Sequence, residues 1–124
     1  MMRRMLGLHL TADLQGCAAA SPLMTEPAAL RRLCRAAVDA AGLQPVGELF
    51  HAFAAPGGVT GVVLLAESHV AVHTWPELGR VTLDVFVCNL HSDNSARAQR
   101  LLAALEASFG AAGVEHHRIE RGQT

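Results

Sequence analysis

Residues 60–88 read TGVVLLAESHVAVHTWPELGRVTLDVFVC. Residues 60–66 form a nearly continuous apolar run, which is typical of a buried central strand. Residues 69–74 and 80–87 alternate between apolar and polar side chains, as strands with one buried face do. Residues 76–79 supply a turn between them. Consecutive strands joined by short turns predict a sheet that is rich in antiparallel pairs.

The flanking segments predict further strands and two helices. Pro27 stands where the first turn of a helix tolerates proline, and Gly42 is well placed to end that helix. The resulting order, β-α-β-β-β-β-α-β, predicts an α+β fold in which both helices pack on one face of the sheet. The further strands are expected at residues 5–12, 46–53 and 114–120, and the helices at residues 28–41 and 94–109.

Composition narrows the class of protein. The 124 residues predict a single domain, 1–124, and 51% of them are hydrophobic, which is enough for a core. Ten basic residues against eleven acidic ones argue against a nucleic-acid or anionic-membrane surface, and no apolar run approaches the ~20 residues of a membrane span. The start of the chain does not read as a secretory signal, and three cysteines without CxxC spacing predict free thiols in the cytoplasm.

Polar side chains gather at the ends of the apolar strands. Burying such groups without partners costs on the order of a few kcal/mol, so they either satisfy one another or line a cleft. The plainest interpretation is a set of hydrogen-bonded strand ends. The members of this cluster are Glu67, Ser68, His69, His73, Glu77, Asp84 and Cys88.

Two familiar kinds of site fit this cluster poorly. A metal site could use His69 and His73, but its further donors, Cys88 and His51, sit at no recognised spacing, and we expect no metal. A serine hydrolase would need a nucleophile elbow such as GxSxG, whereas Ser68 is flanked by Ala-Glu and His-Val.

A third possibility directs Ser68 against its own backbone. Its hydroxyl can attack the carbonyl of Glu67 to give an ester, and elimination followed by hydrolysis leaves a pyruvoyl group at a new N-terminus. This step needs a strained turn at residues 67–68, donors on the carbonyl and a nearby base. Ser68 and His73 lie an odd number of residues apart, so a regular strand places them on opposite faces.

The sequence also resembles a known family. Residues 66–77 (AESHVAVHTWPE) and 83–88 (LDVFVC) closely resemble the prokaryotic S-adenosylmethionine decarboxylase proenzyme family. The likeness extends to residues 50–53, 58–63 and 7–17, and so covers nearly the whole chain. The ESH-x3-HTWPE block, with a cysteine 20 residues after the serine, is a highly specific signature.

The resemblance implies a two-layer αβ sandwich that cleaves itself between Glu67 and Ser68 into a β chain, 1–67, and an α chain, 68–124. It implies that Ser68 becomes a covalent pyruvoyl cofactor, which forms a Schiff base with the substrate amine. It also implies a homodimer of αβ units with interface residues in the sites, and turnover of S-adenosylmethionine to the aminopropyl donor of spermidine and other polyamines. By position, the family assigns processing to His73 and Thr60, the proton of turnover to Cys88, ribose binding to Glu77, adenine stacking to Phe53, and a place near the site to Asp13.

Some positions depart from the family pattern. Thr60 stands for the usual serine, Asp13 for a glutamate, Leu78 and Arg80 for two tyrosines, and Asn89 for a glycine. These changes keep open a pyruvoyl-dependent arginine or ornithine decarboxylase on the same scaffold. An unprocessed paralogue that acts as a binding or regulatory subunit is a further alternative, against which the intact serine, histidine and cysteine argue.

The remaining polar residues are expected to be structural. We expect a solvated terminal strand at His116 and His117 and a solvated helix face at the arginines of the first helix. Cys34 is expected in the core, Cys17 either in the core or in a loop, and His9 and His51 are candidates for lining the cleft. The helix arginines are Arg31, Arg32 and Arg35.

Overall fold

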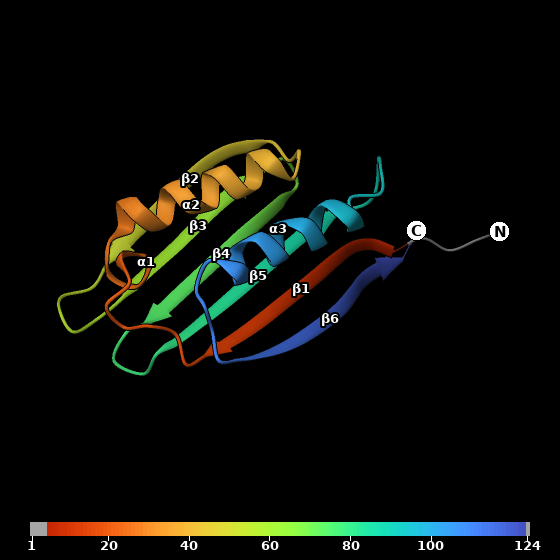
Figure 1. Cartoon of the computed structure of the whole chain (residues 1–124). Coiled ribbons are helices and arrows are strands. Elements are labelled where there is room, and N and C mark those ends of the chain that lie inside the picture. The colour runs from red at the N-terminus through yellow and green to blue at the C-terminus, as the bar shows by residue number, and fades with distance from the viewer. Residues whose placement is uncertain (1–4, 124) are drawn as a thin grey trace.

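One six-stranded sheet carries all the helices on one of its faces (Figure 1). The computed structural model describes residues 5–123. Within these residues, no helix is long and apolar enough to span a bilayer. The strands are β1 (Met5–Gln15), β2 (Pro45–Ala52), β3 (Val59–Leu65), β4 (Ser68–Trp75), β5 (Arg80–Cys88) and β6 (Gly113–Gln123), and the helices are α1 (Pro22–Thr25), α2 (Pro27–Ala40) and α3 (Ser95–Ala107).

The sheet has the order β2-β3-β4-β5-β1-β6, and every neighbouring pair is antiparallel. The α+β class, the antiparallel sheet and the two-layer αβ sandwich are therefore confirmed. The β1 strand comes first in the chain but lies between β5 and β6 (Figure 1). Pairing with β6 extends β1 to Gln15, three residues beyond the predicted end.

The short helix α1 was not predicted, and it makes three helices instead of two. Ser21 caps it, because the serine side chain accepts a hydrogen bond from the N–H of Leu23 at 3.3 Å. Pro22 occupies the first helical turn, where its missing N–H costs nothing. The helix buries Met24 against the core.

The core lies between the helices and the apolar face of the sheet. Alternation along each strand sends one set of side chains to this face, such as Leu8 and Leu10 of β1. The α2 helix buries Cys34 there, and the α3 helix buries Leu101 and Leu105. The expected core position of Cys34 is confirmed, and burial together with the charge of Glu48 raises the pKa of its thiol to about 12.

A salt-bridge cluster ties α2 to the edge strand β2. Arg31 and Arg35 both contact the carboxylate of Glu48, and the prediction of a solvated arginine face is wrong only for Arg35, which is half-buried. The prediction is confirmed for Arg31 and Arg32, which are exposed. Burial pushes the pKa of Glu48 upward, but the hydrogen bonds and charges of the two arginines outweigh it and hold that pKa below its usual range.

The other face of the sheet carries no helix among the described residues, and we call it the open face (Figure 1). Its side chains alternate with those of the core. Register aligns one row of them across the sheet, and several large apolar side chains of this face are exposed. The row is His51, Thr60, His73, Thr82, Asp13 and Glu115. The exposed apolar residues are Leu49, Leu64, Trp75 and Ile119.

Candidate active site

The β3–β4 hairpin turn brings a strained residue next to Ser68. The turn consists of Ala66 and Glu67, since Leu65 pairs with Ser68. Glu67 has φ +56°, and it is the non-glycine residue with positive φ in the described part of the chain. A side chain in this left-handed region costs roughly 1–2 kcal/mol, which is why glycine usually takes such positions. The strain therefore falls on the residue whose carbonyl precedes Ser68.

Ser68 and Cys88 meet at one end of the sheet. The Ser68 hydroxyl accepts a hydrogen bond from the backbone N–H of Cys88 at 3.1 Å. The Cys88 thiol is half-buried and accepts from the N–H of Leu90 at 3.5 Å. Asn94 donates to the Cys88 carbonyl at 2.8 Å, which fixes the end of β5. We call Glu67, Ser68 and Cys88 the serine end.

A pocket of about 450 Å³ opens beside Ser68. His69 stacks on the Phe86 ring at 5.7 Å between centroids, and His9 meets the same ring edge-on at 6.3 Å. Gly7 leaves room for this ring, because a Cβ at position 7 would lie 2.5 Å from it. The lining residues are Leu6, Gly7, Glu67, Ser68, His69, Phe86, Arg121 and Gly122.

Sequence reasoning assigned no role to most of this lining. Arg121 and Leu6 come from strands that are distant in the sequence from Ser68, so spacing alone does not connect them to it. The available signal was the parity of β5, which places Phe86 on the same face as Cys88.

Thr60 and His73 meet at the opposite end of β4. They are register partners, and the Thr60 hydroxyl lies 3.0 Å from Nδ1 of His73. The His73 ring also stacks on Trp75 at 5.9 Å between centroids. The neighbouring Thr74 is 4% exposed, and its hydroxyl accepts from the N–H of Val59 and donates to the carbonyl of Met24, each at 2.8 Å. These bonds hold the start of β3, and therefore Thr60, against β4.

The three predicted substrate-binding residues lie at this same end. Phe53 follows β2, is 54% exposed and meets His51 edge-on at 4.7 Å. Glu77 is exposed in the turn after Trp75, and Asp13 lies on β1 opposite Thr82, the partner of His73. We call Thr60 and His73, together with Phe53, Glu77 and Asp13, the histidine end.

The two ends are far apart within one chain. Ser68 and His73 lie five positions apart along the strand, or about 16 Å at roughly 3.3 Å per residue. Burial along β4 alternates, so Ser68 shares the parity of the core residues Val70 and Val72, while His73 points to the open face. The parity prediction is confirmed. Within residues 5–123, no hydrogen bond joins Ser68 to His73, and the polar cluster seen in the sequence is two clusters in space.

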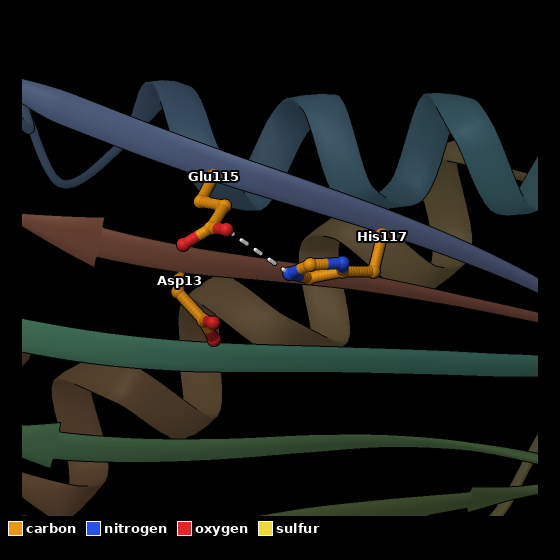
Figure 2. A group of neighbouring side chains, drawn as sticks. All are labelled: Asp13, Glu115 and His117. Carbon is orange, nitrogen blue, oxygen red and sulfur yellow. Dashed lines mark ion pairs between the residues drawn. The ribbon is translucent and has the colours of Figure 1, made fainter.

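One group of side chains has the donors of a metal site (Figure 2). Ligand atoms of Asp13, Glu115 and His117 all lie within 4.8 Å of one another. Nε2 of His117 lies 3.5 Å from Oε1 of Glu115. All three residues are exposed. His69 and His73, the donors considered from the sequence, instead stack on Phe86 and bond to Thr60, respectively. His116 and His117 are exposed, as predicted, although each lies close to a glutamate.

Comparison with known proteins shows what this arrangement is similar to. The sequence profile of the S-adenosylmethionine decarboxylase family matches residues 8–122. The chain belongs to the S-adenosylmethionine decarboxylase family. The resemblance read from the sequence is thereby confirmed.

Curated members of the S-adenosylmethionine decarboxylase family are similar over most of the chain. The S-adenosylmethionine decarboxylase proenzyme of Archaeoglobus fulgidus is 35% identical, with 94% of this chain and 98% of the relative covered. The proenzyme of Moorella thermoacetica is 39% identical, over 96% of this chain and 90% of the relative. The crystal structure of the adenosylmethionine decarboxylase from Aquifex aeolicus superposes with a TM-score of 0.85 at 35% identity, covering 96% of this chain and 92% of that chain.

The structure gives a reason for one departure from the pattern of the S-adenosylmethionine decarboxylase family. Asn89, which stands for a glycine, is 3% exposed and directly follows Cys88. Its N–H donates to the carbonyl of Leu6 at 2.7 Å, and its side-chain oxygen accepts from the N–H of Asn94 at 2.8 Å. The asparagine thus fastens the end of β5 to β1 and to the start of α3.

Proposed function

We propose that the chain is a self-processing, pyruvoyl-dependent S-adenosylmethionine decarboxylase. The observation that carries the proposal is the left-handed Glu67 directly before Ser68, in a family whose curated members are named proenzymes. The product would be decarboxylated S-adenosylmethionine, the aminopropyl donor of spermidine synthesis. We place the activity in the cytoplasm, where the free thiols of Cys17, Cys34 and Cys88 would persist.

The geometry of the serine end supports self-cleavage. The Ser68 hydroxyl attacks the Glu67 carbonyl, its proton passes to the amide nitrogen, and the peptide becomes an ester. Removal of the Ser68 α-hydrogen then expels the Glu67 carboxylate, and water replaces the nitrogen of the new terminus with a carbonyl oxygen as ammonia leaves. Opening the backbone at Glu67 releases the strain of its left-handed conformation.

The pyruvoyl group would supply an electrophilic ketone for the substrate amine, and the amide carbonyl next to it would take up the electron pair left as CO2 departs. Cys88 would give a proton to the former α-carbon, an assignment supported by the contact between its backbone N–H and the Ser68 hydroxyl. Phe53 would stack on the adenine and Glu77 would accept hydrogen bonds from the ribose hydroxyls, with Asp13 nearby.

A complete site requires two copies of the chain. His73, the proposed base of processing, lies about 16 Å along the strand from the Ser68 of its own chain. In a two-fold dimer, residue i of one copy contacts residue j of the other and the reverse, so each serine end can meet the partner's histidine end. The exposed Leu49, Leu64, Trp75 and Ile119 make the open face apolar enough for such an interface.

Denaturing mass spectrometry and a substrate panel test this proposal. The purified protein should give fragments of 67 and 57 residues, since the chain has 124 residues and 124 − 67 = 57, and the second should carry a ketone-reactive end. Ser68→Ala should stay intact. The control Ser108→Ala should be cleaved, because the Ser108 hydroxyl donates to the carbonyl of Ala104 in α3 and lies away from Ser68 in the sequence. A wild-type chain that stays intact would contradict self-processing.

The cleaved protein should release CO2 from S-adenosylmethionine and not from ornithine or arginine. Turnover of either amino acid without turnover of S-adenosylmethionine would assign the chain to the alternative decarboxylases.

A further inference from the structure

The pocket beside Ser68 contains an arginine that the proposed chemistry does not use. Arg121 of β6 lines this pocket together with Ser68, Glu67 and Phe86. Among the described lining residues, it carries the only guanidinium. Arginine keeps its charge at any physiological pH, and its planar fork of donors matches the two oxygens of a carboxylate.

The strand register explains why Arg121 reaches this place. Gly7 of β1 pairs with Cys88 of β5 on one side and with Arg121 of β6 on the other. Cys88 and Arg121 therefore stand in one row across the open face, and the residue between them has no side chain. A side chain at position 7 would collide with the Phe86 ring. The row keeps space between the proposed proton donor and the guanidinium.

We propose that Arg121 binds the α-carboxylate of the substrate, an inference that rests on the proposed function. The amine and the carboxylate of an α-amino acid share one carbon. A substrate whose amine lies at residue 68 therefore carries its carboxylate into the pocket that Arg121 lines. The product has lost this group and gains nothing from the guanidinium, which favours its release.

The role has a distinct kinetic signature. The negative charge leaves the carboxylate as CO2 forms, so the arginine stabilises the bound substrate more than the transition state. Removing a group of this kind raises KM without lowering kcat. A structural role would instead weaken the binding of substrate and product together.

The test compares Arg121→Gln and Arg121→Lys with the control Arg118→Gln. Arg118 is on the same strand but has the opposite parity and lies near Glu120. For S-adenosylmethionine, KM should rise about tenfold to a hundredfold in Arg121→Gln, as expected for a lost hydrogen-bonded ion pair, and less in Arg121→Lys. The inhibition constant of decarboxylated S-adenosylmethionine and the extent of self-cleavage should not change.

A second measurement avoids turnover altogether. The pocket is present in the uncleaved chain, so calorimetric titration of Ser68→Ala and Ser68→Ala/Arg121→Gln measures binding alone. The arginine should strengthen binding of S-adenosylmethionine and not of its decarboxylated form.

Several results would overturn the inference. An unchanged KM in a wild type that turns over S-adenosylmethionine would reject the role of Arg121 and leave the proposed function intact. Equal losses for substrate and product would show a structural role. Slower self-cleavage would show that Arg121 acts on Glu67 during processing. A changed mass of the assembly in solution would show that Arg121 contributes to contacts between chains. A wild type without decarboxylase activity would reject the proposed function itself. The titration would still show whether Arg121 binds the carboxylate of S-adenosylmethionine.

Discussion

The serine end and the histidine end are built in different ways. The serine end depends on backbone geometry: a left-handed Glu67 and a backbone N–H that holds the Ser68 hydroxyl. The histidine end depends on side chains, with Thr60 bonded to His73 above the buried Thr74. In the proposed function the serine end supplies the nucleophile of processing, and the histidine end supplies its base. The proposed nucleophile and the proposed base therefore lie at separate ends of β4, and the proposal is that a second copy of the chain combines them.

The largest expected effect comes from placing the two defects on different chains. Ser68→Ala and His73→Ala should each stay uncleaved when expressed alone. Co-expressed in equal amounts, they should form mixed dimers in which the His73→Ala chain keeps its serine and receives the partner's histidine. About half of the His73→Ala chains should then be cleaved, because random pairing places half of them in mixed dimers. Denaturing mass spectrometry distinguishes the two chains by mass.

Two results would contradict the proposal that the serine end and the histidine end combine across chains. If His73→Ala alone is cleaved at the wild-type rate, the histidine has no part in processing. If both chains stay intact in the mixture although mixed dimers form, the two ends do not combine across chains.

The second largest effect is expected for Cys88, whose substitution should stop turnover but not self-cleavage. Cys88→Ala should cleave itself normally, because the Ser68 contact uses the backbone N–H of residue 88. Its decarboxylation should fall by about 10²- to 10⁴-fold, the usual contribution of a positioned acid, or fail after a few turnovers through protonation at the wrong carbon. CO2 release over time measures this, with the buried Cys34→Ala as the control. Sustained wild-type kcat in Cys88→Ala would remove the thiol from the mechanism.

The histidine end should then show smaller, binding-type effects. Stacking is worth roughly 1–3 kcal/mol per base and a charge-assisted hydrogen bond about 1.5–3 kcal/mol. Phe53→Ala and Glu77→Gln should therefore lower kcat/KM for S-adenosylmethionine by about one to two powers of ten, while self-cleavage persists. Glu26→Gln, an exposed position between α1 and α2 on the helix side of the sheet, is the control. Unchanged kcat/KM in both variants would place the nucleoside elsewhere.

The smallest effect concerns stability and lies away from both ends. The folded state lowers the pKa of Glu48 from its ordinary value of 4.5, so the carboxylate stabilises the fold above that pH. This contribution is lost as the pH falls through the lowered pKa. The Tm of Glu48→Gln should be below that of the wild type at pH 7, and the two should converge on acidification below pH 4.5. Asp39 is exposed on α2, the helix whose arginines contact Glu48, and the Tm of Asp39→Asn should follow that of the wild type at every pH. A difference in Tm between Glu48→Gln and the wild type that does not change with pH would contradict the assignment.

Periodicity was enough to predict most of the fold. The strands and the two long helices have alternation or apolar stripes over many residues, and their order is confirmed. The four-residue α1 is too short to show a period, and the insertion of β1 between β5 and β6 depends on contacts distant in the sequence. The pairing of Arg31 and Arg35 with Glu48 was missed because it joins a helix to a strand across the core edge.

The candidate site could be predicted only in part for a similar reason. Motif and resemblance named the residues at both ends, but the parity of β4 was the only sequence signal that they lie apart. Arg121 and Phe86 reach Ser68 through register across β5, β1 and β6, which a local pattern does not contain.

The strand order has a consequence for the cleaved molecule. Residues 1–67 contribute β1, β2 and β3, while residues 68–124 contribute β4, β5 and β6. In the sheet the two fragments interleave, because β1 is inserted between β5 and β6 and β3 pairs with β4. A break at residue 67 therefore frees a chain end without freeing either piece, and dissociation would require three ladders to separate at once. If the chain cleaves itself as proposed, it would change its covalent structure and remain a single body, with the new terminus at the wall of the pocket.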